Sequence, residues 1–194
     1  MTPLELVFWA LLAALVVQRL AELRLASRNT RALLAAGGRE HDERGYHAFV
    51  VLHALFIAGL VAEFTLAPWA GDVHPLLTGG LLLLFLGAQA LRYWAIRTLG
   101  VRWTTRIVTI PGAAPVRDGP YRYVRHPNYL AVVVELLVIP LAFGLPVTAV
   151  VATAANAVLL ARRIRLEEEA LEKDGPYGDR FGATNRFLPR LGAP

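Results

Sequence analysis

The sequence predicts an all-α integral membrane protein with about five transmembrane helices. Hydrophobic residues make up 56% of the 194 residues, but 20 residues are Lys or Arg, so the apolar residues must be gathered into blocks. Several of these blocks approach the roughly 20 residues that a helix needs to cross a bilayer. All the basic residues lie between the blocks, in the segments 19–44, 92–125 and 162–190.

Three spans are predicted in the first half of the chain, at about 4–20, 46–66 and 76–96. The first span is the shortest, because only Leu6 to Val17 is free of charge. No basic residue precedes this run and no small-residue cleavage site follows it, so we expect a retained helix and not a signal peptide. A polar loop is expected over 19–44, where Gly37 and Gly38 are typical of a helix end.

The run from Tyr129 to Ala161 predicts two further spans. Glu135 is its only charged residue. As one helix, the run would reach roughly 50 Å, well beyond a hydrocarbon core of about 30 Å. Pro140, Gly144 and Pro146 lie near its middle and favour a reversal of the chain. We therefore expect a tight hairpin whose spans cover 129–143 and 146–162.

The distribution of positive charge gives an orientation. With the N-terminus outside and five crossings, all three basic segments lie in the cytoplasm, in agreement with the positive-inside rule. The outside loops, around Asp72 and Gly144, contain no basic residue. We expect a single membrane domain over 1–194, with the loop 97–128 and the C-terminal segment 163–194 in the cytoplasm.

Composition excludes several kinds of chemistry. The chain has no cysteine, which rules out disulfides, thiolate metal sites and cysteine nucleophiles. Its net charge of +5 is expected from cytoplasmic loops facing anionic lipid, and we expect no nucleic-acid partner.

Residues 97–128 have the composition of a ligand-binding loop. Glycines and prolines fix turns, while Arg, His and Tyr side chains supply hydrogen-bond donors and aromatic faces. The alternative is an electropositive loop that lies on anionic headgroups.

A second polar cluster, RIRLEEEAL at 163–171, follows the last span. On a helix, Arg163 and Glu167 are four residues apart and share a face. The alternative is a solvated helix end with salt bridges. Ionisable residues within or beside the spans, such as His53 and Glu135, suggest function by default, although interhelical hydrogen bonds would also explain them.

These motifs together resemble those of a known family. GPYRYVRHPNY at 119–129, the apolar hairpin and RIRLEEEAL are similar to the isoprenylcysteine carboxyl methyltransferase family and its phospholipid methyltransferase relatives. The resemblance covers about residues 85 to 182 and implies a membrane methyltransferase of five helices. It also implies S-adenosylmethionine as cofactor and S-adenosylhomocysteine as product, with no metal required.

The resemblance assigns roles to particular residues. Arg163 and Glu167 would face the acceptor as catalytic residues. The cofactor would be bound by His126, Tyr129, Glu168, Tyr121, Arg125 and Pro127. A general base, Glu167 or His126, would assist if the acceptor were a phenol or an enol.

The N-terminal half is more similar to a bacterial branch found beside type III polyketide synthases, whose members O-methylate alkylpyrones or alkylresorcinols. The resemblance implies a lipophilic acceptor that enters laterally from the bilayer, with a prenylcysteine-like carboxylate as the other possibility. The expected acceptor mouth comprises Glu22, Arg28, Asn29 and Tyr46.

Other readings remain open at this point. The acceptor could be an aminophospholipid, the cofactor could be NADPH as in membrane sterol reductases, or the protein could be a scaffold without catalysis. Gly79, Gly80 and Gly87 would permit close helix packing, either inside the bundle or in a homo-oligomer.

Overall fold

The computed structural model describes residues 2–182 and 184–189, without the side chains of residues 43 and 44. Its main elements, in chain order, are α1 (Pro3–Ala35), β1 (Arg39–His41), α2 (Glu43–Leu66), α3 (Pro75–Leu99), β2 (Ile107–Thr109), α4 (Pro127–Ala142), α5 (Pro146–Asp174) and α6 (Tyr177–Phe181). Two short 3-10 helices, η1 (Gly100–Arg102) and η2 (Gly119–Arg122), lie in the loop between α3 and α4.

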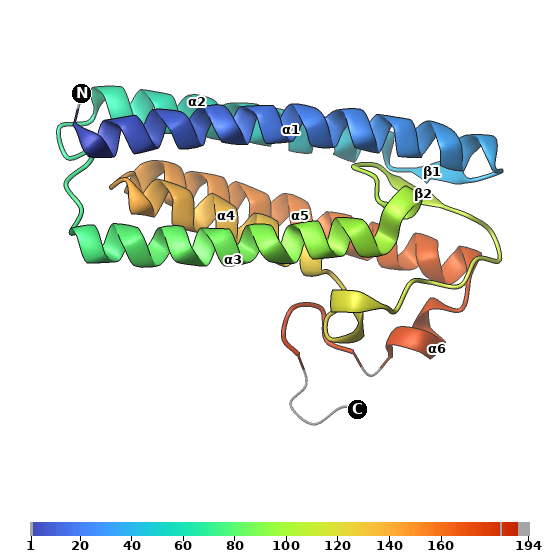
Figure 1. Cartoon of the computed structure of the whole chain (residues 1–194). Coiled ribbons are helices and arrows are strands. Elements are labelled where there is room, and N and C mark those ends of the chain that lie inside the picture. Colours follow the sequence, from blue (N-terminus) through green and yellow to red (C-terminus); the bar gives the residue numbers. More distant parts are fainter. Residues whose placement is uncertain (1, 183, 190–194) are drawn as a thin grey trace.

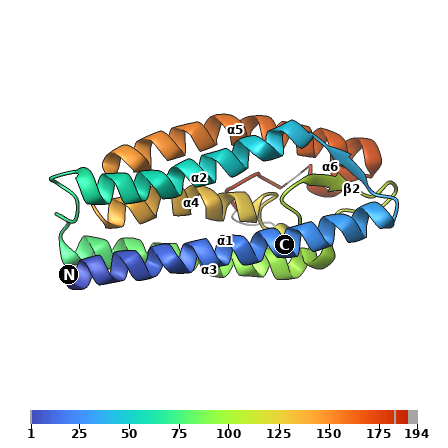
Figure 2. The same cartoon turned by 90° about the horizontal axis from the view of Figure 1, so that it is seen from above.

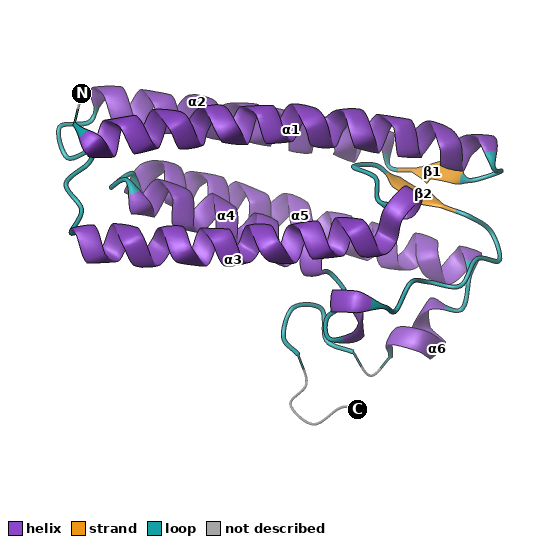
Figure 3. Ribbon diagram, in the orientation of Figure 1, coloured by secondary structure: helices purple, strands orange, loops and turns teal. Residues whose placement is uncertain are grey.

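Helices α1 to α5 form an elongated bundle (Figures 1 and 2). In Figure 1, α1 and α2 lie above α3, α4 and α5. Helix α4 packs between α3 and α5, and α2 packs on α5. The two strands and α6 lie toward one end of the bundle (Figure 3). We call it the basic end because most Lys and Arg residues fall in the segments that meet there.

The predicted all-α membrane fold is confirmed. In the described part of the chain, four helices are long and apolar enough to cross a membrane: α1, α2, α3 and α5. Helix α4 is also apolar but has only 16 residues. The strands β1 and β2 form a small antiparallel ladder that the all-α prediction did not include, with Arg39 opposite Thr109 and His41 opposite Ile107.

Two helices extend beyond the predicted spans. Helix α1 continues through the expected polar loop to Ala35, and α5 continues to Asp174. The 29 residues of α5 measure about 43 Å, so its charged last turns must project beyond a hydrocarbon core of about 30 Å. Arg, Glu, Leu and Ala are strong helix formers, which explains why these helices continue where the apolar run ends.

The predicted hairpin is present. Helix α4 keeps Pro140 within its last turn, and the chain reverses through Gly144 before α5 begins at Pro146. Gly144 has a φ of +69°, and an added Cβ would lie 3.0 Å from the Val73 side chain, so this turn requires glycine. Gly71 N donates to Phe143 O, which attaches the α2–α3 loop to the turn.

Aromatic rings pack the opposite end of the bundle. The Phe8 ring of α1 stacks on that of Phe64 of α2 with centroids 3.7 Å apart, and both rings meet Phe143 edge-on. These contacts hold α1, α2 and the hairpin together at the end that lies away from the basic residues.

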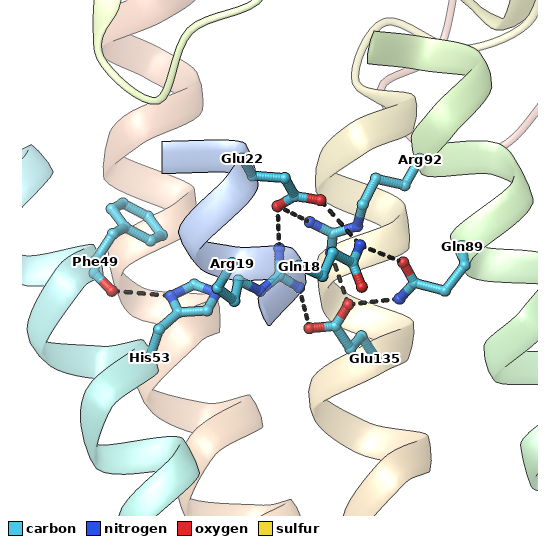
Figure 4. Close-up of polar contacts among 8 residues, drawn as sticks. All are labelled: Gln18, Arg19, Glu22, Phe49, His53, Gln89, Arg92 and Glu135. Atoms are coloured by element: carbon cyan, nitrogen blue, oxygen red, sulfur yellow. Dashed lines mark hydrogen bonds and ion pairs between the residues drawn. The ribbon is translucent and has the colours of Figure 1, made fainter. Parts of the chain in front are cut away.

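A buried polar network joins α1, α3 and α4 near the middle of the bundle (Figure 4). The carboxylate of Glu135, which is 1% exposed, accepts hydrogen bonds from Arg92 Nη2 at 2.8 Å, from Gln89 Nε2 at 2.8 Å and from Arg19. Glu22 pairs with the same two arginines. Two guanidinium groups are thus balanced by two carboxylates, which favours a structural role for Glu135.

The three glycines of α3 face away from the bundle. A Cβ added at Gly79, Gly80 or Gly87 would meet no described atom within 4 Å. They therefore do not serve close packing inside the described part of the chain.

Candidate active site

Two cavities meet at the basic end of the bundle. The first, the polar cavity, lies between the α3–α4 loop and the end of α5, and its lining includes Tyr121, Arg125, His126, Glu167, Asp174 and Tyr177. The second, the apolar cavity, encloses about 530 Å³ and lies chiefly between α1 and α2, with Leu20, Leu23, Val50 and Ile57 among its lining residues. Five residues line both cavities: Trp103, Thr104, Asn128, Tyr129 and Arg163.

Tyr129 and Arg163 form the polar part of this shared wall. Arg163 Nε donates a 2.7 Å hydrogen bond to the Tyr129 hydroxyl, and Arg163 Nη2 donates to Thr105 O at 2.9 Å. The Tyr129 hydroxyl donates in turn to Glu167 Oε2. The Phe49 ring covers the guanidinium from α2, 5.3 Å from its centroid. The structure thus brings the predicted pair Arg163 and Glu167 together through Tyr129.

His126 and Glu168 lie beside this wall. His126 precedes α4 and Pro127 is its first residue, where a fixed φ suits the start of a helix. His126 Nε2 lies 3.0 Å from Glu168 Oε1, and Arg186 binds both carboxylate oxygens of Glu168, at 3.1 and 2.6 Å. His126 lines the polar cavity, whereas Glu168 and Pro127 do not.

The environment of Glu168, beyond the apolar part of α5, keeps it ionised. Partial burial would raise its pKa, but hydrogen bonds and charge from His126 and Arg186 outweigh this effect and lower the pKa to about 2. Burial raises the pKa of Tyr121 and of Tyr177 above the usual range, so both phenols remain neutral.

Residues 184–186 are hydrogen-bonded to the two residues that precede α4. Arg125 N donates to Asn185 O at 3.0 Å, and His126 N donates to Arg186 O at 3.1 Å. Arg125 Nε donates to Thr184 O. Residues 184–186 therefore lie along residues 125–126 and fix the backbone that carries two predicted cofactor-binding side chains.

A cluster of hydrogen-bonded polar side chains lies at the far side of the polar cavity. The hydroxyl of Thr109 in β2 donates to the carboxylate of Asp174 at the end of α5, and His41 Nε2 lies 2.8 Å from the same hydroxyl. Arg39 adds an ion pair with Asp174 at 3.3 Å. The hydrogen bond from Thr109 and the charge of Arg39 lower the pKa of Asp174. This carboxylate therefore presents a negative charge to the cavity.

The residues predicted for the acceptor mouth divide into two groups. Glu22 and Tyr46 line the apolar cavity. Arg28 is exposed and lines neither cavity. Asn29 also lines neither, because its side-chain amide donates to Gly100 O and Trp103 O and thereby fixes η1 against α1.

Sequence reasoning did not select several lining residues. Asn128 and Trp103 lie inside the loop that was recognised, but nothing in their local sequence distinguished them. Asp174 was missed because its partners come from β1 and β2, far away in the chain. Asn156 had a signal, since an amide inside an apolar run is unusual in a membrane helix.

The fold and cavities define a helical membrane protein with a polar site at one end of the bundle. The family model described as isoprenylcysteine carboxyl methyltransferase (ICMT) family matches residues 81–173, which include both motifs discussed above. The chain belongs to this family of methyltransferases, and the predicted resemblance is confirmed.

Two curated relatives cover most of the chain. The uncharacterised protein YpbQ of Bacillus subtilis is 39% identical over 166 residues, which are 86% of this chain and 97% of that protein. An uncharacterised protein of Haemophilus influenzae is 28% identical over 160 residues, 82% of this chain and 91% of that protein.

A solved structure shares the fold. The eukaryotic intramembrane Ras methyltransferase ICMT superposes with a TM-score of 0.61 at 19% sequence identity. The match covers 73% of this chain and 52% of that enzyme, so this chain spans about half its length.

Proposed function

We propose that this protein is an S-adenosylmethionine-dependent O-methyltransferase of the bacterial inner membrane, with the polar cavity facing the cytoplasm. Its acceptor is a lipophilic small molecule with an acidic oxygen, such as an alkylresorcinol, an alkylpyrone or a prenylcysteine carboxylate. The observation that carries the proposal is the wall shared by a polar and an apolar cavity. Such a wall allows a polar cofactor and a lipid-tailed acceptor to meet.

The polar cavity suits the charges of the cofactor. Glu167 and Asp174 present carboxylates that would attract its ammonium and sulfonium groups, and Tyr121 and Tyr177 supply aromatic faces. Arg125 also lines this cavity and would pair with the carboxylate of the cofactor, in addition to Glu168, which lies 3.6 Å from Arg125 Nη1. When bound, the cofactor supplies a methyl group that is already activated on sulfur, and S-adenosylhomocysteine is the product. His126 would contact the cofactor directly, while Glu168 would hold His126 in position.

The apolar cavity suits a hydrocarbon tail. Its rim includes Leu20 of α1 and Val50 of α2, which are 51% and 41% exposed, so a lipid would reach it between these helices. Burying the tail there provides the favourable free energy that places the polar head at the shared wall.

The shared wall suits an acidic oxygen. The Arg163 guanidinium would orient the acceptor oxygen and stabilise its negative charge. Glu167 is hydrogen-bonded to the Tyr129 hydroxyl and would take up the proton of a phenol or an enol through it. An ammonium acceptor would be repelled by Arg163, which favours oxygen over nitrogen as the methylated atom.

The test is methyl transfer from labelled S-adenosylmethionine by the purified protein in nanodiscs. Pentadecylresorcinol, an alkylpyrone, a farnesylcysteine and phosphatidylethanolamine would be offered as acceptors. We expect label in one of the oxygen acceptors and none in the amine. Label in phosphatidylethanolamine alone would replace the proposal with N-methylation.

A further inference from the structure

Besides Arg19, Glu22 and Arg92 of the buried network, the lining of the apolar cavity includes two polar residues, Asn156 and His53, that belong neither to this network nor to the shared wall. Asn156 of α5 lines this cavity and is 1% exposed, yet neither its amide nitrogen nor its amide oxygen has a hydrogen-bond partner among the described residues. An unpaired buried amide lowers stability, so such a group calls for an explanation.

His53 of α2 also lines this cavity. His53 Nδ1 lies 2.8 Å from Phe49 O within its own helix (Figure 4). A carbonyl oxygen only accepts hydrogen bonds, so Nδ1 must carry the proton. In the neutral ring, Nε2 is then an acceptor, and it has no partner among the contacts of the described residues.

Helix packing places the two residues at a similar depth. Helices α2 and α5 pack side by side in opposite directions. At one end the Glu63 carboxylate accepts from the amides of Val147 and Thr148, and at the other Phe49 covers Arg163. Between these contacts, His53 and Asn156 both line the cavity, and their depths along the two helices differ by less than about one helical turn.

We propose that Asn156 and His53 form a second polar subsite, which binds a hydroxyl group that the acceptor carries in addition to the methylated oxygen. A hydroxyl accepts from the Asn156 amide nitrogen and donates to His53 Nε2 or to the Asn156 oxygen. The subsite thus selects an uncharged group with both a donor and an acceptor. This inference rests on the proposed function and narrows it. The acceptor is a diol, or a ring that carries a second hydroxyl-like group beside the methylated oxygen.

The spacing agrees with such a ring. Asn156 lies two turns before Arg163 on α5, a rise of about 10 Å. This rise is about the length of a ring with two hydroxyls in meta positions plus one hydrogen bond at each hydroxyl. A ring hydroxyl held at Arg163 would therefore place a second hydroxyl near Asn156.

The test compares the binding of two probes that differ by one hydroxyl, meta-pentadecylphenol and the corresponding pentadecylresorcinol, by calorimetry in nanodiscs. The wild-type protein should bind the resorcinol about 10-fold more tightly. Asn156→Leu and His53→Phe, which keep the branched or ring shape of the side chain and remove its hydrogen-bonding atoms, should bring this ratio close to one. Thr153→Val is the matched control, because Thr153 Oγ1 is also buried without a partner among the described residues, but Thr153 lines neither cavity.

Three results would overturn the subsite. The wild-type protein could bind both probes equally, it could bind neither, or the affinity ratio could be unchanged in Asn156→Leu. A melting curve for each variant shows whether it is folded. The probes are bound without cofactor, so failure of the subsite can be told apart from failure of the proposed function. The proposed function fails if the wild-type protein does not bind S-adenosylmethionine.

Discussion

Arg163 and Tyr129 are 34 residues apart in the chain, and a 2.7 Å hydrogen bond from Arg163 Nε to the Tyr129 hydroxyl joins them at the wall between the two cavities. The same hydroxyl donates to Glu167, so one phenol connects a cation that faces both cavities to a carboxylate that faces the polar one. The proposed transfer of a methyl group takes place across this connection.

Replacing Tyr129 with Phe removes the connecting hydroxyl and keeps the ring. We expect kcat to fall by about 100-fold, because Glu167 loses its route to the acceptor proton. Cofactor affinity should change little. Tyr123→Phe is the control, since Tyr123 is 56% exposed and lines neither cavity. An unchanged kcat in Tyr129→Phe would exclude a role for the hydroxyl in turnover.

The Glu168 cluster predicts a dependence of stability on pH. The pKa of this carboxyl is lowered to about 2 in the folded protein, so its ionised form stabilises the fold above its ordinary pKa of 4.5. This contribution is lost as the pH falls from 4.5 toward 2. We expect Glu168→Gln to melt below the wild-type protein at pH 7, and the difference to shrink in acid.

The exposed neighbour Glu169 provides the control for this experiment. Glu169→Gln should melt like the wild-type protein at every pH. A difference between Glu168→Gln and the wild-type protein that persists undiminished at pH 3 would contradict the assigned ion cluster.

The buried network predicts a large effect on stability. Changing Glu135 to Leu leaves Arg19 and Arg92 without one of their two carboxylates, and Arg92 is only 2% exposed. We expect a loss of about 3 kcal/mol in the free energy of unfolding in detergent. Glu169→Gln again serves as the exposed control. A loss as small as that of the control would mean that the network does not hold α1 to α3 and α4.

The gap between α1 and α2 is proposed as the route of the acceptor. Val50→Trp should lower kcat/KM for long-tailed acceptors and leave cofactor affinity unchanged, because the larger side chain would obstruct the cavity rim. Leu84→Trp, at a position 54% exposed on α3, controls for an added surface tryptophan. Equal kcat/KM for Val50→Trp and Leu84→Trp would place the route elsewhere.

The sequence predicted the helices well because the length of an apolar block sets a span and Pro and Gly set a reversal. The predicted spans 4–20 and 146–162 end before α1 and α5 do, since hydropathy marks where a helix leaves the membrane and not where it stops. Ala35 and Asp174 are the actual last residues, and both follow charged sequence that is itself helix-forming.

The candidate site was predictable only in part. His126, Tyr129 and Arg163 stand in motifs whose residue types indicate their chemistry. The positions of Thr109 and Asn29 depend instead on how segments distant in the chain pack together, and local sequence carries no signal for such contacts. The same holds for the position of Tyr129 between Arg163 and Glu167.

Calorimetric titration with S-adenosylmethionine tests the central claim most directly. The wild-type protein in nanodiscs should bind the cofactor with a Kd on the order of micromolar, which corresponds to a binding free energy of about −8 kcal/mol. His126→Ala should weaken this binding, while Tyr123→Phe should not. A folded wild-type protein that does not bind S-adenosylmethionine, and binds NADPH instead, would contradict the account.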